Sequence, residues 1–202
     1  MQVAVLGAGG KAGKELVQEL RRRGHGVIAV GRNAGNLPSG EGIEARVADV
    51  SDAAAMAGAV TGADAVISAL QFDIPASTFV AALKQAGVER LIVTGGAASL
   101  DNGEGVMIYD TPTFPDFLKP IVKPAIDFLA DLRAEQELNW SFFSPAMMFV
   151  EGERVGTFRT GTDTMLFNEA GESKITYADG AIAMVDELEQ ENHPRARWTA
   201  AY

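Results

Sequence analysis

The sequence predicts an α/β fold in which a doubly wound parallel sheet carries helices on both faces. Short β-rich runs alternate with helical patterns from the first residue, which is typical of βαβ units. Most of these runs, such as 27–30 and 91–93, are almost continuously apolar, as expected of strands that are covered on both faces. A glycine-rich segment, 7–13, joins the first run to the first helical pattern. Right-handed crossovers would place the helices on both sides of the sheet.

Six apolar runs are predicted to be strands. Between the first two, Leu16 and Leu20 are four residues apart and share one face of an amphipathic helix. The predicted strands lie at about residues 2–6, 27–31, 43–48, 64–68, 89–94 and 139–144.

Two prolines mark the predicted starts of later helices. Pro75 is placed for a helical first turn, and Phe79 and Leu83 form the apolar face that follows it. Pro124 is predicted to open another helix. The apolar stripe of that helix would consist of Ala125, Phe128, Leu129 and Leu132.

The pattern changes at about 145–202, where glycines separate short polar and apolar stretches. A helix at about 177–190 and a last strand-like run follow. Thr176 and Asp179 have the spacing of a capping box, in which two side chains pair with each other's backbone N–H groups. No long linker or repeat separates this part from the rest. We therefore expect a single domain, 1–202, whose small C-terminal appendage completes the sheet and covers a substrate site.

The composition excludes several classes of protein. The chain has 202 residues and no cysteine, and 17 Lys+Arg against 27 Asp+Glu give a formal net charge of −10. The lack of cysteine excludes disulfides and thiolate chemistry. An acidic chain whose longest basic cluster is Arg21–Arg23 lacks the positive surface that nucleic-acid phosphates require. We expect no metal site and no nucleic-acid partner, and nothing in the sequence indicates the oligomeric state.

No segment is predicted to enter a membrane. The most hydropathic window, 53–72, is rich in alanine and is interrupted by Gly58, Gly62 and Asp64. The amino terminus has no basic region before an apolar run, so it does not resemble a signal peptide. We expect a protein of the cytoplasm.

The segment Gly7-Ala8-Gly9-Gly10-Lys11-Ala12-Gly13 points most directly to function. At a strand-to-helix turn, glycines allow a tight bend, close approach of the backbone to a pyrophosphate, and close packing of the helix on the strand. The anion then lies on the unpaired amides at the positive end of the helix. The usual G-x-G-x-x-G spacing fails at Ala12, but Gly7-x-x-Gly10-x-x-Gly13 is a known variant. We predict a dinucleotide-binding loop; the alternative is a purely structural turn.

The end of the second predicted strand favours NADP over NAD. An acidic residue at this position accepts hydrogen bonds from the adenosine ribose and selects NAD. This chain has Arg32, which cannot accept a hydrogen bond but can donate to a 2′-phosphate. We expect NADPH to be preferred over NADH; the alternative is a solvated surface arginine. Lys11 could add charge near the phosphates or be exposed to solvent.

Further segments follow the glycine loop and Arg32 in chain order, namely Ala48–Val50, Ala63–Leu70, Val93–Ala97 and Ser144–Ala146. Together they resemble the NAD(P)H-binding, atypical short-chain dehydrogenase/reductase group, which includes NADH-flavin reductases, biliverdin reductase B and NmrA-like proteins. The resemblance covers essentially the whole chain, and from Ser144 onward it is most similar to the flavin-reductase branch. It implies a Rossmann-like fold.

The resemblance also implies a path for the cofactor along the carboxyl ends of the strands, where ligands of open parallel sheets bind. Asp49 and Val50 would lie beside the adenine, although a loop-capping role is the alternative for Asp49. Thr94, Gly95 and Gly96 would approach the nicotinamide. The remaining implied contacts are Ser68, Ala69 and Leu70 along the ribose and pyrophosphate, and Pro145 and Ala146 after the sixth strand.

The proton-transfer pair of typical short-chain dehydrogenases is missing. Those enzymes use Tyr-x-x-x-Lys, but neither Tyr109 nor Tyr177 is followed by a lysine four residues later. His25 and His193 are predicted to be structural or solvated. Biliverdin-reductase relatives carry a histidine shortly after the sixth strand, where this chain has Ala146–Met148, and this disfavours biliverdin as a substrate.

A site without acid–base groups favours an acceptor that can take its proton from water, such as a flavin or a quinone. Ser99 is predicted to hydrogen-bond the acceptor, with loop capping as its alternative, and Tyr109 is the second candidate catalytic residue. The sequence leaves open whether FMN or FAD would be a substrate or a bound cofactor. Candidate walls of the acceptor site, which could equally be core residues, are Phe114, Phe117, Met147, Met148 and Phe149.

The segment from Gly95 to about Lys119 is long for a connection in an α/β fold and is expected to be a loop that covers the substrate. The primary hypothesis is an NADPH-dependent reductase of flavins or quinones. The alternative is an NmrA-like redox sensor that binds NADP without turnover. A sugar-nucleotide epimerase ranks third, because such enzymes resemble longer chains and normally keep the Tyr-x-x-x-Lys pair.

Overall fold

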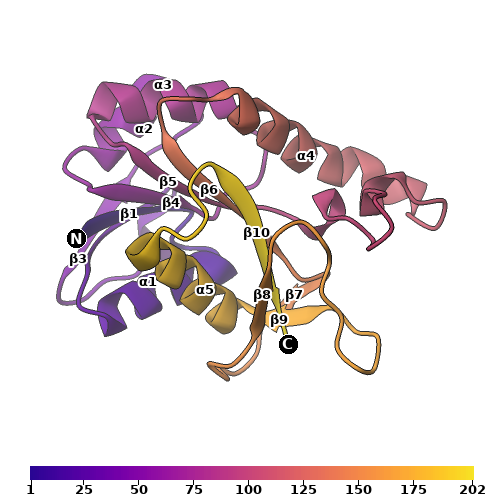
Figure 1. Ribbon diagram of the computed structural model, residues 1–202. Helices are drawn as coiled ribbons and strands as arrows, with labels where there is room; N and C mark the ends of the chain where they lie inside the picture. The colour runs from indigo at the N-terminus through magenta and orange to yellow at the C-terminus, as the bar shows by residue number, and fades with distance from the viewer.

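The computed structural model describes residues 1–202, which form a mostly parallel eight-stranded sheet with helices on both faces (Figure 1). All neighbouring strands of this sheet pair in parallel except the last two. The predicted doubly wound α/β class is therefore confirmed. In spatial order the strands are β3 (Ile43–Val47), β2 (Gly26–Gly31), β1 (Gln2–Leu6), β4 (Ala65–Ser68), β5 (Arg90–Thr94), β6 (Asn139–Pro145), β10 (Ala196–Ala201) and β8 (Arg159–Gly161).

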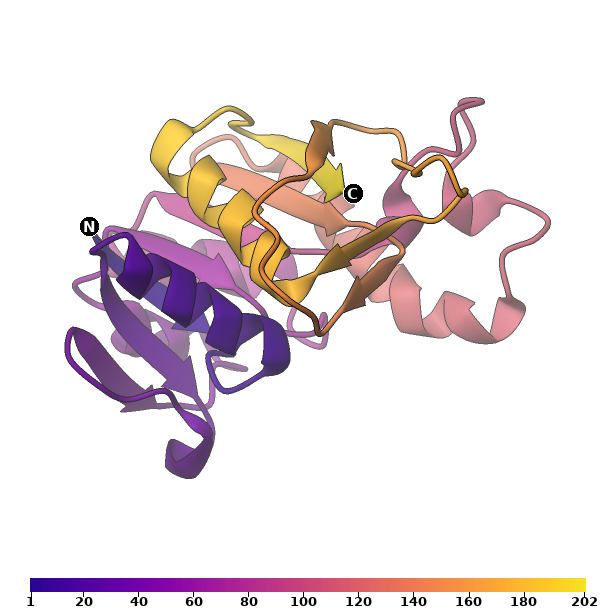
Figure 2. The ribbon, with the colours of Figure 1, turned by 90° about the horizontal axis from the view of Figure 1, so that it is seen from below.

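Five α-helices cover the sheet. They are α1 (Lys11–Arg22), α2 (Ala53–Val60), α3 (Ala76–Ala86), α4 (Lys119–Ala134) and α5 (Tyr177–Gln190). The helices α2, α3 and α4 enclose one apolar core against the sheet, and α1 and α5, which lie side by side in Figure 2, enclose the other. Strands that are apolar on both faces separate these two cores, as the continuous apolar runs predict.

The first six strands and α1 lie where the sequence predicts them, but α2 was not predicted. Five of its eight residues are alanine, so no apolar stripe marks one face. The helix begins because the side chain of Asp52 accepts a hydrogen bond from Ala55 N at 2.9 Å. It accounts for part of the hydropathic window at 53–72. None of the helices combines the length and the apolar character needed to cross a membrane.

The prediction that Pro124 opens a helix is wrong. The helix α4 begins at Lys119, and Pro124 lies inside it. Pro120 occupies the first turn, where a missing N–H is tolerated, and Lys119 Nζ pairs with Asp116 Oδ1 at 2.7 Å at the helix start. Pro124 removes one hydrogen bond from the helix interior.

The C-terminal part adds a separate two-stranded sheet of β7 (Met148–Val150) and β9 (Lys174–Thr176). Thr176 caps α5 as expected, because its Oγ1 accepts from Asp179 N at 3.2 Å. The reciprocal hydrogen bond of the predicted capping box, from Thr176 N to the Asp179 side chain, is absent. The Asp179 carboxylate instead accepts from Val155 N at 3.1 Å and Gly156 N at 2.9 Å, and so ties the preceding loop to the helix.

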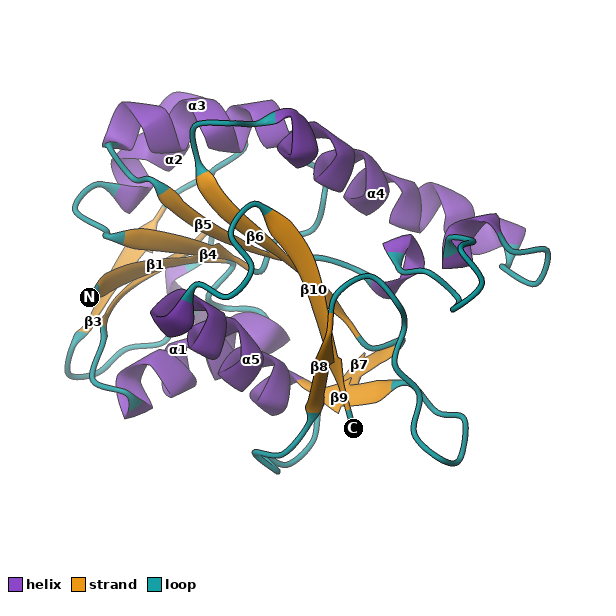
Figure 3. Cartoon of the chain, in the orientation of Figure 1, coloured by secondary structure: helices purple, strands orange, loops and turns teal.

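The long connection after β5 is not structureless. It contains three short 3₁₀ turns, η2 (Ala97–Ser99), η3 (Ile108–Asp110) and η4 (Asp116–Leu118), and a fourth, η1 (Ala34–Asn36), follows β2. Figure 3 shows the connection folded beside the first turns of α4, beyond the edge of the sheet. Its position is compatible with a covering loop, although its role stays a prediction.

Candidate functional site

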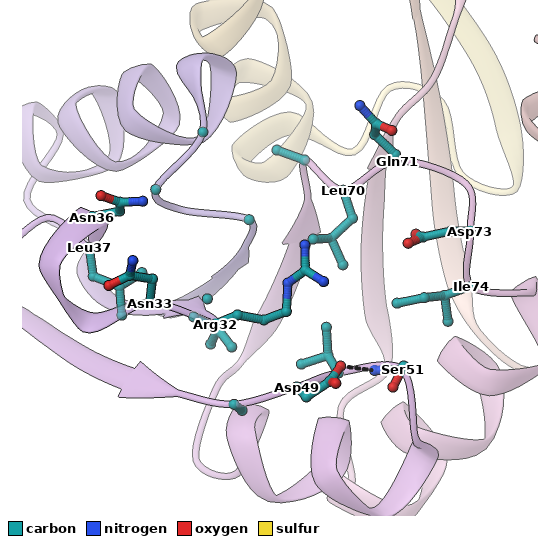
Figure 4. A pocket seen from close by; sticks show the side chains of 18 residues that line it. Arg32, Asn33, Asn36, Leu37, Asp49, Ser51, Leu70, Gln71, Asp73 and Ile74 are labelled. Atoms are coloured by element: carbon teal, nitrogen blue, oxygen red, sulfur yellow. Dashed lines mark hydrogen bonds between the residues drawn. The ribbon is translucent and has the colours of Figure 1, made fainter. Parts of the chain in front are cut away.

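A cleft of about 610 Å³ opens at the carboxyl ends of β1, β2, β3 and β4 (Figure 4). This is the edge of the sheet where a parallel fold binds its ligand. The predicted cofactor residues that line the cleft are Gly7, Gly9, Gly10, Arg32, Asp49, Val50, Ala69 and Leu70.

The glycine loop is held tightly between the sheet and α1. Gly7 has a φ of +81°, and a Cβ atom there would lie 2.9 Å from the Ala69 carbonyl oxygen. A Cβ atom at Gly13 would lie only 2.1 Å from the Gly7 carbonyl oxygen. Gly10, the N-cap of α1, has no side-chain cap, so the first N–H groups of the helix are available to an anion.

Arg32 extends into the middle of the cleft from the end of β2 (Figure 4). Its side chain is exposed and makes no hydrogen bond or ion pair within the chain. Asp49 lies across from it and accepts a hydrogen bond from Ser51 N at 3.1 Å. Hydrogen bonds from Ser51, and more weakly the positive charge of Arg32, lower the pKa of Asp49. Asp49 therefore combines the loop-capping role with a place in the cleft wall.

The remaining predicted residues of the glycine loop and of β4 lie outside the cleft. Lys11 Nζ pairs with Glu151 Oε1 at 3.3 Å, and both side chains are mostly exposed. Ala12 and Gly13 belong to the first turn of α1. Ser68 is buried at the end of β4, where its hydroxyl accepts from Leu70 N at 3.4 Å.

The predicted cofactor residues at the carboxyl ends of β5 and β6, of which 94–96 were expected near the nicotinamide, do not line the cleft either. Thr94 is buried, and its Oγ1 donates to Met184 Sδ at 3.2 Å. A Cβ atom at Gly95 would lie 2.1 Å from the ring of Phe142, so this glycine is required by packing. Gly96 precedes η2, while Pro145 ends β6 and Ala146 is buried after it.

Ser99 and Tyr109, the candidate catalytic residues, lie on the same connection. Ser99 is 6% exposed, and its Oγ lies 3.3 Å from Ser144 Oγ and 3.4 Å from the Gly96 carbonyl oxygen. The Tyr109 ring is half-buried against Phe114. Lys119 Nζ lies 5.9 Å from the centre of the Tyr109 ring, so the fold brings a lysine to this tyrosine although the sequential motif is absent.

The candidate walls divide into two groups. Phe117, Met147 and Met148 are exposed, by 74%, 58% and 39%, and could contact an acceptor. Phe149 packs edge-on against Tyr177, with 4.6 Å between ring centres, and against Phe143. It therefore belongs to the core between β6 and α5.

The histidines lie away from the cleft and make structural contacts, as expected. His25 Nε2 lies 2.9 Å from Glu189 Oε1, and His193 Nδ1 lies 2.7 Å from Glu187 Oε2.

The sequence reasoning missed most of the polar lining of the cleft. These residues lie in the loops after β2, β3 and β4, close in sequence to the predicted cofactor residues. Their nearness in sequence was the only signal that could have identified them. They are Asn33, Asn36, Ser51, Gln71 and Asp73.

Comparisons with known proteins place the chain among nucleotide-binding proteins. Residues 7–191 match the model of a family described as NAD(P)H-binding. Three solved structures align over the whole chain: a "putative exported protein" from Burkholderia pseudomallei (39% identity, all of that chain, TM-score 0.90), a "putative epimerase" from Bacteroides thetaiotaomicron (36%, 96% of that chain, 0.92) and a "putative NADH-flavin reductase" from Streptococcus pneumoniae TIGR4 (34%, 99% of that chain, 0.87).

Proposed function

The chain belongs to the NAD(P)H-binding family, and from that premise we propose that it is an NADPH-dependent reductase that passes a hydride to a flavin, a quinone or a similar acceptor. The observation that carries the proposal is Arg32, whose unpaired guanidinium group lies in a cleft beside the glycine loop. A guanidinium group presents several N–H donors in a planar fork that matches a phosphate. An unpaired one in this position is suited to a ligand phosphate.

The cleft residues fit the dinucleotide. Gly7, Gly9 and Gly10 leave room for its pyrophosphate beside the free N–H groups at the start of α1. Arg32 would hold the 2′-phosphate, and Asp49 would lie near the adenine. Bound NADPH would supply the hydride.

The side chains that we propose to contact the acceptor favour a substrate that needs little acid–base catalysis. The exposed apolar side chains of Phe117, Met147 and Met148 would stack a planar acceptor, which could take its proton from water. The relative from Streptococcus pneumoniae, which is named as a flavin reductase, supports the same acceptor class. The relative named as an epimerase favours a different reaction, but this chain lacks the Tyr-x-x-x-Lys pair that we expect of an epimerase.

One observation favours the alternative of a redox sensor that binds NADP without turnover. The hydroxyl of Ser99 lies beside Ser144 Oγ and the Gly96 carbonyl oxygen, so its hydrogen is directed to groups of the chain itself in this conformation. In a reductase that binds its acceptor through Ser99, this side chain would rotate while its backbone stays in place, whereas a sensor would need no such change.

The test is to follow the absorbance of the reduced nicotinamide when the purified protein meets NADPH or NADH, with and without FMN and menadione, beside a direct titration with NADPH. We expect oxidation of NADPH above NADH with at least one acceptor. Tight binding without oxidation by any acceptor would favour the sensor. No binding at all would contradict the dinucleotide site.

The cytoplasmic location expected from the sequence stays a proposal, since the relative from Burkholderia pseudomallei is named as an exported protein. The C-terminal part, 145–202, is likewise proposed to cover the acceptor.

A further inference from the structure

A buried arginine on β10, Arg197, joins segments that are far apart in the sequence. It is 9% exposed, and its Nη1 donates to the Ser99 carbonyl oxygen. Its Nε donates to Asp163 Oδ1 at 3.1 Å, and its Nη2 donates to the same carboxylate. A guanidinium group is costly to bury unless its donors are satisfied. Here the partners come from the connection after β5 and from the loop after β8.

The two partner segments are also bonded to each other. Asp101 N donates to the Asp163 carbonyl oxygen at 2.8 Å, and Met165 N donates to the Asp101 carbonyl oxygen at 2.9 Å. A bond from Ile108 N to the Leu100 carbonyl oxygen, at 2.8 Å, then folds η3 back onto η2. The segment 99–108, which begins at Ser99 and ends directly before Tyr109, is therefore anchored to β10 through Arg197.

The face of the sheet beneath this segment is polar. Ser144 on β6 and Thr199 on β10 are neighbours in register, and both are fully buried. Ser144 Oγ lies 3.3 Å from Ser99 Oγ, whereas Thr199 Oγ1 has no hydrogen-bond partner. A shift of the segment would change which hydroxyl groups meet, so the anchor at the Ser99 backbone fixes the position from which the Ser99 side chain extends.

We propose that Arg197 is a positioning residue for acceptor reduction, because it holds the backbone of Ser99 and the side chain of Asp163 in one place. The inference rests on the proposed reductase function. Arg197 itself would touch neither the acceptor nor the nucleotide, and it acts through Ser99 and the segment 99–108.

The variant Arg197→Lys keeps the charge but loses the planar group that reaches both partners at once. We expect kcat/KM for FMN or menadione to fall on the order of tenfold or more, because small displacements of positioning groups have effects of this size. The dissociation constant of NADPH, measured by titration, should not change, because Arg197 is remote from the cleft. Asp163→Asn, which weakens one partner only, should give a smaller loss.

Arg46→Lys is the matched control. Arg46 on β3 also binds one carboxylate, with Nε donating to Glu44 Oε1 at 2.7 Å, and two backbone carbonyl oxygens, with Nη1 donating to those of Ala59 at 3.0 Å and Thr61 at 2.7 Å. It neither contacts Ser99 nor lines the cleft. We expect its acceptor kinetics to equal those of the wild type. A thermal melt of each variant shows whether it is folded.

Hydrogen exchange gives a reading that does not depend on turnover. In Arg197→Lys the amides of Asp101 and Met165 should exchange faster, and in Arg46→Lys they should not. Unchanged exchange at these amides, or faster exchange with the acceptor kinetics of the wild type, would overturn the inference. If the wild-type protein oxidised NADPH with none of the acceptors, the proposed reductase function would be overturned instead. The role of Arg197 in reduction would then fall with it.

Discussion

The two halves of the sheet differ in whether their arginine side chains are paired within the chain. The nucleotide half, β3-β2-β1-β4, ends in an open cleft in which Arg32 has no partner. The other half, β5-β6-β10-β8, carries arginines that are buried and paired, Arg90 on β5 at 6% exposure and Arg197 on β10 at 9%. Unpaired donors in a cleft are suited to binding, whereas buried charges with partners hold segments of the chain together. Arginine is therefore available for ligand binding in one half and joins segments of the chain in the other.

The paired charges are clearest at the amino ends of β5 and β6. Arg90 Nη2 lies 3.0 Å from Glu187 Oε1, and Ser141 Oγ donates to the same oxygen at 2.9 Å. His193 contacts the other carboxylate oxygen. This cluster fastens α5 to the sheet on the side opposite the cleft.

The largest expected effect is in this cluster. Glu187→Ala leaves the buried charge of Arg90 without its carboxylate partner, and we expect a loss of about 3–5 kcal/mol in the free energy of unfolding. Urea denaturation measures it. Glu151→Ala is the control, because Glu151 forms an exposed pair with Lys11, and its loss should cost less than about 1 kcal/mol. Equal effects of the two substitutions would break the comparison between buried and exposed pairs.

The second prediction concerns Glu19, which joins the halves through Arg154 of the C-terminal part. Burial raises the pKa of its carboxyl, but hydrogen bonds from Arg154, Arg23 and Arg22 outweigh burial and lower the pKa from 4.5 to about 2. The stabilisation is therefore present above pH 4.5 and is lost as the pH falls toward 2. We expect this loss to be about 3 kcal/mol.

The measurement is the free energy of unfolding of the wild type and of Glu19→Gln between these pH values. The difference between the two proteins should shrink on acidification, because the charge that distinguishes them is removed. A difference independent of pH would show that the Glu19 charge does not hold the halves together.

The third prediction separates two glycines of the nucleotide half. Gly13→Ala puts a methyl group 2.1 Å from the Gly7 carbonyl oxygen and should cost about 2–3 kcal/mol of unfolding free energy. Gly10→Ala meets the same oxygen at 3.3 Å and should cost less stability than Gly13→Ala, while it weakens NADPH binding by crowding the pyrophosphate. Thermal melts and NADPH titrations of both variants check this. Similar losses of stability would argue against separate roles.

The smallest expected effect is on cofactor choice. Arg32→Glu should weaken NADPH binding by about 1–3 kcal/mol, the scale of a hydrogen bond to a charged group, and weaken NADH binding much less. Titration with both nucleotides measures it. An equal loss for both would mean that Arg32 does not contact a 2′-phosphate, and the contrast between the open and the paired half would lose its functional meaning.

Much of the fold and part of the site could be predicted, because their signals are local. The glycine loop and Arg32 follow strands whose apolar character is visible in the sequence, so the parallel fold places them at one edge. The start of α4 was mistaken because Pro124 can lie inside a helix when tertiary packing outweighs the lost hydrogen bond. The polar lining from Gln71 to Asp73 carries no motif, so only the folded loop identifies it.

The sequence by itself determined the class of fold, the order of the strands along the chain and the loop that fits a dinucleotide, since each depends on neighbouring residues. Only the tertiary structure decided which charges are buried and what they bind. Arg90 and Glu187 are 97 residues apart, and Arg197 lies 98 residues from the carbonyl that it holds. A buried charge is tolerated only where it has a partner, and here the partner comes from a distant segment of the chain. A local sequence pattern cannot reveal such a contact.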